Sequence, residues 1–487
     1  MTARPTTLGA LRTSGYTSRG VKQELRENLR RRLAEGGVIL PGLIGYDRTV
    51  VPQVCNALLS RHDFILLGLR GQAKSRILRA LPSLLDEVVP VIDGSEVNDD
   101  PLAPISAWGK SMVAEHGDDT PVGWLSRDER YAEKLATPDV TIADLIGDID
   151  PIKAATKRLS FDNEGVLHFG LLPRTHRGIV AINELPDLQA RIQVGLLNIL
   201  EEGDVQIRGY PVRFPLDVAL VFSANPEDYT NRGNIITPLR DRIASQIITH
   251  YPRTLEQARA ITAQEAEVSR EPATDVEVPD LLADLVEEVA FVARESEFID
   301  QNSGVSARMT ISLMENLVSN AERRSLLNGE GATVARVGDL YAALSAVTGK
   351  VELVYEGERE GPEAVARHLM GQAVKKVFDA TLPAAFEGDD QDGGPYHDVL
   401  AWFQQGGTLD VSDSDDEEVL NAKLSDVPGL EKVVRSNLEP EGLGMLLFGM
   451  ELVLEGLHQS SLLSKDELLD GRVYKDPFGE MAASLDP

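Results

Sequence analysis

The sequence predicts an α/β domain built around a parallel sheet, then an all-α domain, then a mostly helical acidic extension. From Gly37 to about Pro252, short apolar runs alternate with amphipathic stretches, the pattern of strand–helix units around a parallel sheet. After Pro252, apolar residues recur at helical spacing instead. We therefore expect an N-terminal polar and helical segment, an α/β domain, an all-α domain and an extension, covering residues 1–36, 37–252, 253–350 and 351–487.

Length and charge limit the classes of protein that fit. A chain of 487 residues is too long for one domain of about 150 residues. Its 78 acidic and 48 basic residues give a net charge of −30, so no nucleic-acid partner is expected. A single cysteine, Cys55, excludes an intrachain disulfide and a Cys-based zinc site. The most apolar stretch, Gly442–Leu457, is too short for a membrane span and contains Glu451 and Glu455. We expect a buried helix there and a cytoplasmic protein without a membrane span.

Four apolar runs are the strand candidates, and their apolar character on both sides predicts a sheet covered by helices on both faces. These runs are Phe64–Leu67, Val88–Ile92, Gly178–Ile182 and Leu216–Phe222. Helices are predicted by the spacing of apolar residues over Val21–Ala34, Leu255–Ser269, Pro279–Glu297, Ser306–Leu326, Ala335–Thr348 and Pro362–Ala380.

Two segments of biased charge are predicted to lack regular structure. The first 23 residues contain no Asp or Glu, and we expect a frayed basic tail. Residues 377–422 contain no Lys or Arg, and their densest acidic run is Asp413–Glu418. Such a run is typical of a solvated loop or linker. A docking surface for a basic partner is the alternative.

The clearest functional motif follows the first predicted strand directly and leads into a helix. It matches the phosphate-binding pattern G-x-x-x-x-G-K-[ST] except at Ala73, which is tolerable while its φ stays negative. Backbone N–H groups of such a loop wrap a β-phosphate. Lys74 would then reach the β- and γ-phosphates and Ser75 would hold Mg²⁺. The predicted nucleotide-binding residues are Gly68, Leu69, Arg70, Gly71, Gln72, Ala73, Lys74, Ser75 and Arg76.

A second motif, Asn183-Glu184, ends the predicted strand that begins at Gly178. Phosphate-loop ATPases place an acidic pair at this edge of the sheet, where the first acid steadies Mg²⁺ and the second activates water. Asn183 can hydrogen-bond a metal-bound water but supplies no charge, which predicts weaker Mg²⁺ affinity or slower turnover. Glu184 is the predicted catalytic base.

Two further polar groups follow the last predicted strand. Ser223-Ala224-Asn225 places a polar residue where it can contact a γ-phosphate or position water. Arg240 and Arg242 follow in the chain, and an arginine at the edge of a ring subunit can enter the neighbour's site. A surface arginine paired with Asp241 is the alternative for Arg242.

Together these motifs resemble those of the AAA+ ATPases and, within them, the magnesium-chelatase ATPase subunit and its MoxR-type relatives. The resemblance covers about residues 37–350 and includes Leu40-Pro-Gly-Leu-Ile-Gly45 ahead of the first strand. That family commonly has alanine at the position of Ala73. Residues 351–487 have no counterpart in this resemblance. For that reason a chelatase-like role is expected in preference to porphyrin chelation itself.

This resemblance also implies roles for individual residues and a mechanism. Asn225 would sense the γ-phosphate, Arg242 would be the arginine finger with Arg240 as the alternative, and Arg308 would be the sensor on the helical lid. The implied protein is an ATP-hydrolysing, Mg²⁺-dependent motor in a homo-oligomeric ring of about six subunits, because a finger acts on a neighbouring subunit.

Three functions remain open at this level. The resemblance favours a motor that remodels a client or partner protein, for metal or cofactor loading, with a von Willebrand A-domain partner. A true magnesium-protoporphyrin chelatase subunit is one alternative. The neutral Asn183 favours the other, a nucleotide-dependent scaffold with little hydrolysis. An activator of alternative sigma factors is disfavoured because its Gly-Ala-Phe-Thr-Gly-Ala loop is absent.

Overall fold

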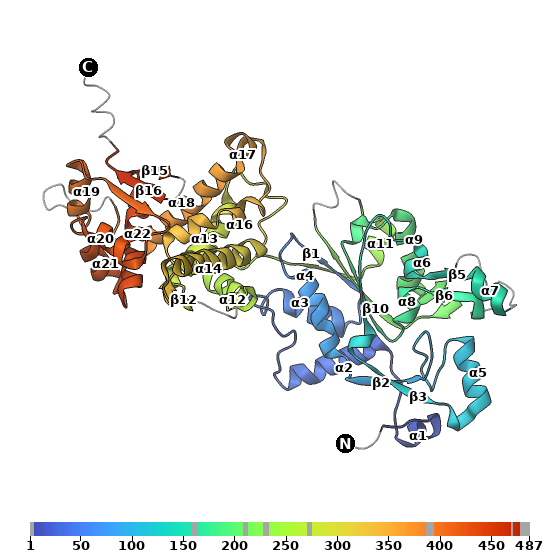
Figure 1. Ribbon diagram of the computed structural model, residues 1–487. Coiled ribbons are helices and arrows are strands. Elements are labelled where there is room, and N and C mark those ends of the chain that lie inside the picture. Colours follow the sequence, from blue (N-terminus) through green and yellow to red (C-terminus); the bar gives the residue numbers. More distant parts are fainter. Residues whose placement is uncertain are drawn as a thin grey trace. The chain divides into compact units, whose positions relative to one another are not determined.

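The chain folds into two compact units, Met1–His250 and Tyr251–Pro487 (Figure 1). Their division lies within two residues of the boundary expected after residue 252. A computed structural model describes residues 4–157, 164–207, 213–226, 233–269, 275–385, 394–468 and 471–477.

The first unit is built on a five-stranded, wholly parallel sheet in the order β11-β1-β10-β7-β4. The sheet strands are β1 (Phe64–Leu67), β4 (Tyr131–Leu135), β7 (Gly178–Asn183), β10 (Val218–Ala224) and β11 (Ser245–Ile248). The other strands of the unit are β2 (Val88–Ile92), β3 (Val122–Ser126), β5 (Gly147–Ile149), β6 (Leu167–Phe169), β8 (Asp204–Gln206) and β9 (Arg213–Pro215). Its helices are α1 (Leu8–Thr13), α2 (Val21–Ala34), α3 (Val50–Leu59), α4 (Lys74–Ala80), α5 (Ala107–His116), α6 (Ile142–Leu145), α7 (Pro151–Lys157), α8 (Leu171–Arg174), α9 (Ala190–Glu202) and α11 (Thr237–Arg242).

Successive residues of the central strands supply two different hydrophobic cores, one on each face of the sheet. Phe64 and Leu66 of β1 pack with residues of α2, α3 and α4, whereas Ile65 packs in the core that contains α9 and α11. Strands β7 and β10 alternate in the same way. Because side chains along a strand alternate between faces, a sheet covered on both sides needs continuous apolar runs. The predicted fold class is therefore confirmed.

One strand prediction is wrong in its placement, and two strands of the sheet were not predicted. Val88–Ile92 is a strand, but it pairs antiparallel with Val122–Ser126 in a separate two-stranded sheet. Both edges of the central sheet, Tyr131–Leu135 and Ser245–Ile248, are strands that apolar runs do not reveal. Edge strands are partly exposed and carry polar residues, so their sequences differ from those of buried strands.

The predicted frayed tail is wrong for the described part of the N-terminal segment. Leu8 and Leu11 of α1 are fully buried, and the Leu8 N–H donates to Thr120 O at 3.0 Å. From α2, the Glu24 carboxylate accepts a 2.8 Å hydrogen bond from the buried Arg130 guanidinium. The segment is an integral part of the first unit.

The second unit is mainly helical and has one continuous hydrophobic core. The predicted helices Leu255–Ser269, Pro279–Glu297, Ser306–Leu326 and Pro362–Ala380 are present, the first of them ending at Glu265. The prediction of one helix over Ala335–Thr348 is wrong: the segment forms two short helices, Val337–Ala342 and Ser345–Thr348. Helix α18 (Pro362–Thr381) of the predicted extension packs against α13 (Asp280–Glu295) of the predicted lid and against α22 (Leu443–Gln459). The helices are α12 (Leu255–Glu265), α13 (Asp280–Glu295), α14 (Arg308–Asn328), α15 (Val337–Ala342), α16 (Ser345–Thr348), α17 (Tyr355–Glu360), α18 (Pro362–Thr381), α19 (His397–Gln404), α20 (Glu417–Ser425), α21 (Leu430–Leu438) and α22 (Leu443–Gln459). The strands are β12 (Asp275–Glu277), β13 (Ala332–Val334), β14 (Leu409–Ser412), β15 (Ser464–Leu468) and β16 (Gly471–Lys475).

The described part of the acidic segment 377–422 is not a solvated linker, which corrects the expectation from composition; residues 386–393 of that segment lie outside the described residues. Residues 397–425 contain α19, β14 and α20. Asp416 caps the start of α20 by accepting the Val419 N–H at 2.7 Å, and Lys423 pairs with Asp415 at 2.7 Å. Carboxylates are favoured at a helix N-terminus because they satisfy free N–H groups and interact well with the helix dipole.

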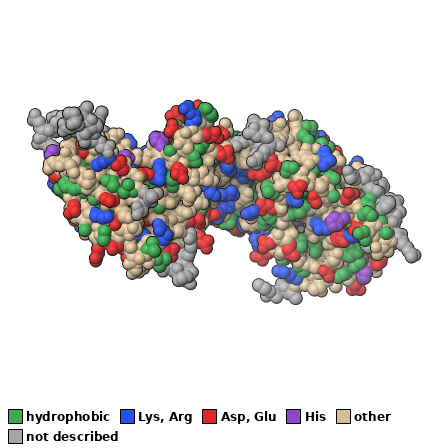
Figure 2. Space-filling model, turned by 45° about the horizontal axis from the view of Figure 1, so that its top comes forward, with side chains coloured by type: hydrophobic (Ala, Val, Ile, Leu, Met, Phe, Trp, Pro, Cys, Tyr) green, Lys and Arg blue, Asp and Glu red, His purple; other side chains and the backbone are tan. Residues whose placement is uncertain are grey.

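The most apolar helix, α22, is buried as predicted, from Leu446 to Leu457. None of the helices within the described residues is long and apolar enough to cross a membrane. Asp and Glu side chains are spread over the visible surface of both units (Figure 2).

Candidate functional site

The predicted phosphate loop connects β1 to α4 at the carboxyl edge of the central sheet, and neighbouring elements brace it. The Thr249 hydroxyl donates to Gln72 Oε1 at 2.7 Å. The Tyr46 hydroxyl donates to Gln72 O at 2.9 Å, and the Gly68 N–H donates to Ala224 O at 3.2 Å. The loop is therefore held between the segment that precedes α3, strand β10 and the chain that follows β11.

Backbone geometry explains the glycines of the loop. A Cβ on Gly68 would lie 2.0 Å from Thr249 Oγ1, so no larger residue fits there. Gly71 has a φ of 75°, a left-handed conformation that glycine adopts at little cost. Ala73 also has a positive φ, 53°, so the condition of a negative φ, on which its tolerance was predicted, is not met. Left-handed residues in a short loop turn N–H groups to one side, as in phosphate-binding nests.

Ala73→Gly is expected to raise the free energy of unfolding by about 0.5–1 kcal/mol. The left-handed conformation costs a residue with a Cβ about 1–2 kcal/mol, and replacement by glycine removes this cost. Part of the gain is lost because glycine makes the unfolded state more flexible. Urea unfolding measures the change. Ala114→Gly on the exposed face of α5 is the matched control and should cost about 1 kcal/mol. A loss of stability at both positions would contradict the left-handed conformation of Ala73.

Three predicted site residues, far apart in the sequence, form one hydrogen-bonded chain. Lys74 Nζ donates to Asn225 Oδ1 at 2.5 Å, and Asn225 Nδ2 donates to Glu184 Oε2 at 3.1 Å. The Lys74 ammonium also donates to Leu69 O at 2.9 Å. Lys74 is only 7% exposed. The phosphate loop, the end of β7 and the end of β10 thus meet at one point.

Asn183 precedes Glu184 in the sequence, and its side chain forms hydrogen bonds with residues of both neighbouring strands. Its Nδ2 donates to Glu133 Oε1 of β4 at 2.6 Å, and its Oδ1 accepts from the Ser223 hydroxyl of β10 at 2.8 Å. Ser223 Oγ in turn lies 3.4 Å from the Glu184 backbone N–H, which donates to it. The neutral amide is therefore anchored inside the network and is buried.

Glu133 is the residue that the sequence analysis missed. Arg79 of α4 binds its carboxylate with two hydrogen bonds, at 2.7 and 3.0 Å, and this pairing lowers the pKa of Glu133 below its ordinary range. The only signal in the sequence is the alternation of Tyr131, Glu133 and Leu135 in a polar edge strand. That pattern does not show which strand lies next to it.

The predicted arginines lie in different places. Arg242 ends α11 and is paired with Glu201 of α9, with Nε donating to Oε2 at 2.7 Å, and not with Asp241. Arg240 is exposed. Arg308 belongs to the second unit, where it begins α14 and is exposed. Their roles as finger and sensor remain predictions.

The chemical groups at this edge of the sheet are of the types that bind a nucleotide and Mg²⁺. An ammonium and backbone N–H groups suit phosphate oxygens. The Ser75 hydroxyl and the Asn183 amide oxygen are oxygen ligands of the type that Mg²⁺ accepts. The amide carries no charge, so the site lacks one of the charges that usually balance Mg²⁺ there.

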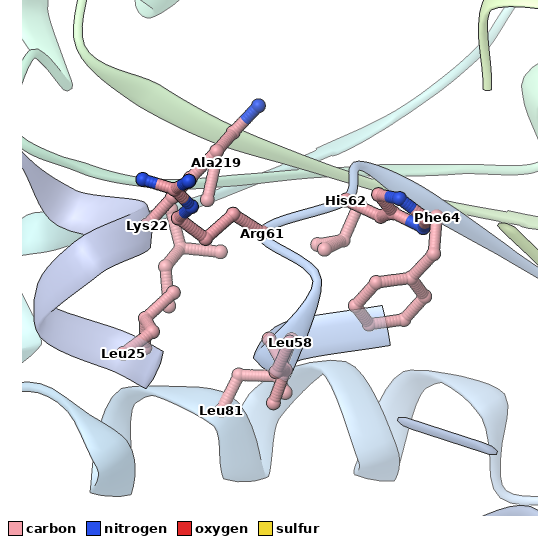
Figure 3. Close-up of a pocket in the computed structure, with 10 residues that line it drawn as sticks. Lys22, Leu25, Leu58, Arg61, His62, Phe64, Leu81 and Ala219 are labelled. Carbon is pink, nitrogen blue, oxygen red and sulfur yellow. The ribbon is translucent and has the colours of Figure 1, made fainter. Parts of the chain in front are cut away.

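A small cavity in this unit is lined by the basic residues Lys22, Arg61 and His62 but is too small for a nucleotide (Figure 3). It lies at the amino ends of the strands, where Leu25, Leu58, Phe64 and Leu81 surround it (Figure 3). Its volume is about 10 Å³, room for about one water molecule. The carboxyl edge, where Lys74, Asn225 and Glu184 meet, is the candidate site.

The fold and the site define an α/β phosphate-loop protein with a helical C-terminal part. No protein-family model matches the chain. The magnesium-chelatase 38 kDa subunit of Cereibacter sphaeroides is 29% identical over 206 residues, 42% of this chain and 55% of the relative. The magnesium-chelatase subunit ChlI of Anabaena variabilis is 28% identical over 219 residues, 44% of this chain and 60% of the relative. The chain thus spans little more than half the length of these relatives.

Solved structures show weaker likeness. NtrX from Brucella abortus in complex with ATP has a TM-score of 0.34 and 15% identity, covering 60% of this chain and 53% of that one. The complex of the BchI and BchD subunits of magnesium chelatase gives a TM-score of 0.31 and 19% identity, covering 73% and 99%. Scores of this size support no conclusion. The curated relatives do: the chain resembles the AAA+ subunits of magnesium chelatase, as its motifs predict.

Proposed function

We propose that this chain is an AAA+ ATPase that hydrolyses ATP at the carboxyl edge of its central sheet. The observation that carries the proposal is the hydrogen-bonded chain Lys74–Asn225–Glu184, which joins a phosphate-loop lysine to a carboxylate through one amide. A surface turn without a ligand is not expected to bring a lysine, an amide and a carboxylate into contact on a loop that neighbouring elements hold in place.

Each group has a distinct task in this proposal. Lys74 binds the β- and γ-phosphates, whose oxygens can replace the neutral oxygens of Leu69 and Asn225 that now accept from its ammonium. Glu184 accepts a proton from the attacking water. Asn225 contacts both Lys74 and Glu184. It therefore fixes the position of the carboxylate that activates water relative to the lysine that binds phosphate. Ser75 and Asn183 would hold Mg²⁺, which would supply positive charge to balance the phosphates.

We further propose that the protein works as a homo-oligomeric ring in which Arg242 completes the site of a neighbouring subunit. In the single chain Arg242 is held by Glu201, an exposed pair that is worth little and is readily exchanged for another acidic partner. The proposed work of the ring is remodelling of a client or partner protein, for metal or cofactor loading, with a von Willebrand A-domain protein as partner. Arg308 would couple the helical lid to the bound nucleotide.

Two other functions have one observation each in their favour. Similarity to magnesium-chelatase subunits favours a true chelatase subunit. The neutral Asn183 favours a nucleotide-dependent scaffold. Steady ATP turnover would exclude the scaffold, and magnesium insertion into protoporphyrin by the assembled partners would establish the chelatase.

Lys74→Ala is expected to weaken binding of MgATP at least thirtyfold. Removing one member of a buried charged contact costs about 2–5 kcal/mol, and each 1.4 kcal/mol is about tenfold in affinity. Isothermal titration calorimetry measures the affinity, and a melting curve confirms the fold. Lys110→Ala, an exposed lysine of α5, is the matched control and should bind normally. Unchanged affinity in Lys74→Ala would refute the proposed site.

A further inference from the structure

Glu133 joins the phosphate-loop helix to the strand that carries the candidate base. Its carboxylate accepts from Arg79, which is on α4 together with Lys74 and Ser75. The same carboxylate accepts from Asn183 at the end of β7 at 2.6 Å. The contact therefore fixes two parts of the candidate site relative to each other.

An asparagine amide has a donor end and an acceptor end, and its partners decide which end points where. Glu133, held as a carboxylate by Arg79, only accepts, so it takes the Nδ2 end of Asn183. The Oδ1 end must then face β10, where it accepts from the Ser223 hydroxyl at 2.8 Å. An Asp at position 183 would need no such orientation, because both of its oxygens accept.

The orientation of the Asn183 amide affects the backbone of the candidate base, Glu184, through the Ser223 hydroxyl. Because the Ser223 hydroxyl donates to Asn183 Oδ1, its lone pairs are free to accept the Glu184 backbone N–H, 3.4 Å away. Glu184 has a φ of 54°, a conformation that a residue with a Cβ keeps only when its surroundings hold it. Rotation of the Asn183 amide would break this sequence of hydrogen bonds at its first link.

We propose that Glu133 is a positioning residue of the ATPase site, which sets the amide orientation of Asn183 and, through Ser223, the placement of Glu184. The inference rests on the proposed function. Glu133 does not touch the reacting atoms in this scheme, since its oxygens are bound by Arg79 and Asn183. The role follows from the neutral residue at position 183, and it explains how an amide can stand where an acid is usual.

A charge exchange between positions 133 and 183 tests the pairing. Glu133→Gln leaves two amides facing each other beside Arg79, and Asn183→Asp places two carboxylates in contact. The double variant restores one amide and one carboxylate with the hydrogen bond reversed. We expect each single variant to raise the unfolding equilibrium constant about tenfold, the loss of one charge-assisted hydrogen bond, and Glu133→Gln to lower kcat about tenfold. Asn183→Asp also adds a charge at the candidate Mg²⁺ site, so its stability is the readout of the pairing. The double variant should return within about threefold of wild type in both quantities.

Nucleotide affinity measured in EDTA separates positioning from general damage. Glu133→Gln should leave it within about twofold, because Lys74 and the loop are untouched. Tyr131→Phe is the matched control: it removes the 3.3 Å contact of the hydroxyl with Glu133 Oε2 but not the Asn183 contact, and should keep wild-type kcat.

If the wild-type protein hydrolyses ATP, two outcomes would refute the role of Glu133 while leaving the proposed function intact. One is additive loss in the double variant. The other is recovery of stability without recovery of kcat, which would make the contact structural only. A wild-type protein that binds no nucleotide would instead refute the proposed function, and this inference with it.

Discussion

Glu184→Gln is expected to lower kcat for ATP hydrolysis at least a hundredfold while MgATP still binds. General-base catalysis contributes about 10²–10⁴-fold, and the glutamine amide has almost no basicity. Its carbonyl oxygen can still accept the hydrogen bond from Asn225 Nδ2, so the network that holds Lys74 should persist. Phosphate release under saturating MgATP measures kcat, and calorimetry measures affinity.

Glu202→Gln is the matched control, because Glu202 is an exposed carboxylate at the end of α9. It should hydrolyse ATP at the wild-type rate. Full activity in Glu184→Gln would remove Glu184 from the mechanism. Nucleotide binding without turnover in the wild type would instead favour the scaffold and point to Asn183 as the cause.

Glu455→Gln is expected to destabilise the second unit by about 3–5 kcal/mol. Glu455 of α22 is fully buried and accepts from the Tyr341 hydroxyl at 2.7 Å and the Tyr474 hydroxyl at 2.9 Å. Lys465 pairs with it at 2.9 Å and is only 5% exposed. Removing one member of a buried pair leaves the other charge without compensation, which is the costly case. Urea unfolding followed by circular dichroism measures the loss.

The double variant Glu455→Gln with Lys465→Met removes both charges and should recover part of the stability. Arg435→Gln in the exposed Arg435–Glu431 pair is the control, and should cost less than about 1 kcal/mol. Equal costs for the buried and exposed pairs would contradict the burial of Glu455.

The same carboxylate makes stability depend on pH in the acid range. Burial by itself would raise the pKa of Glu455, but Lys465 and the hydrogen bonds from Gln459 and Tyr341 outweigh it and lower the pKa to about 2. Since the folded pKa is below the unfolded value of about 4.3, the contribution is complete above that value. It is lost as pH falls toward 2. Glu455→Gln should flatten the pH dependence of unfolding in this window.

Local features of the fold and site were predictable from the sequence. Helices such as Val21–Ala34 and Pro362–Ala380 appear as predicted within one or two residues, because helical spacing is a short-range pattern. The phosphate loop was equally visible, since its residues are contiguous and lie between a strand and a helix. Composition was a poorer guide: the acidic run around Asp413–Glu418 is folded, because its carboxylates cap a helix and pair with Lys423.

By itself, then, the sequence determined the fold class, the phosphate loop and the candidates Lys74, Glu184 and Asn225. Only the tertiary structure decided that Val88–Ile92 lies outside the central sheet and that Tyr131–Leu135 lies inside it. That choice places Glu133 against Asn183 across 50 residues of chain. Periodicity records which face of a strand is apolar, whereas strand order depends on contacts between distant segments. For this reason the residue that orients Asn183 appears only when the sheet is assembled.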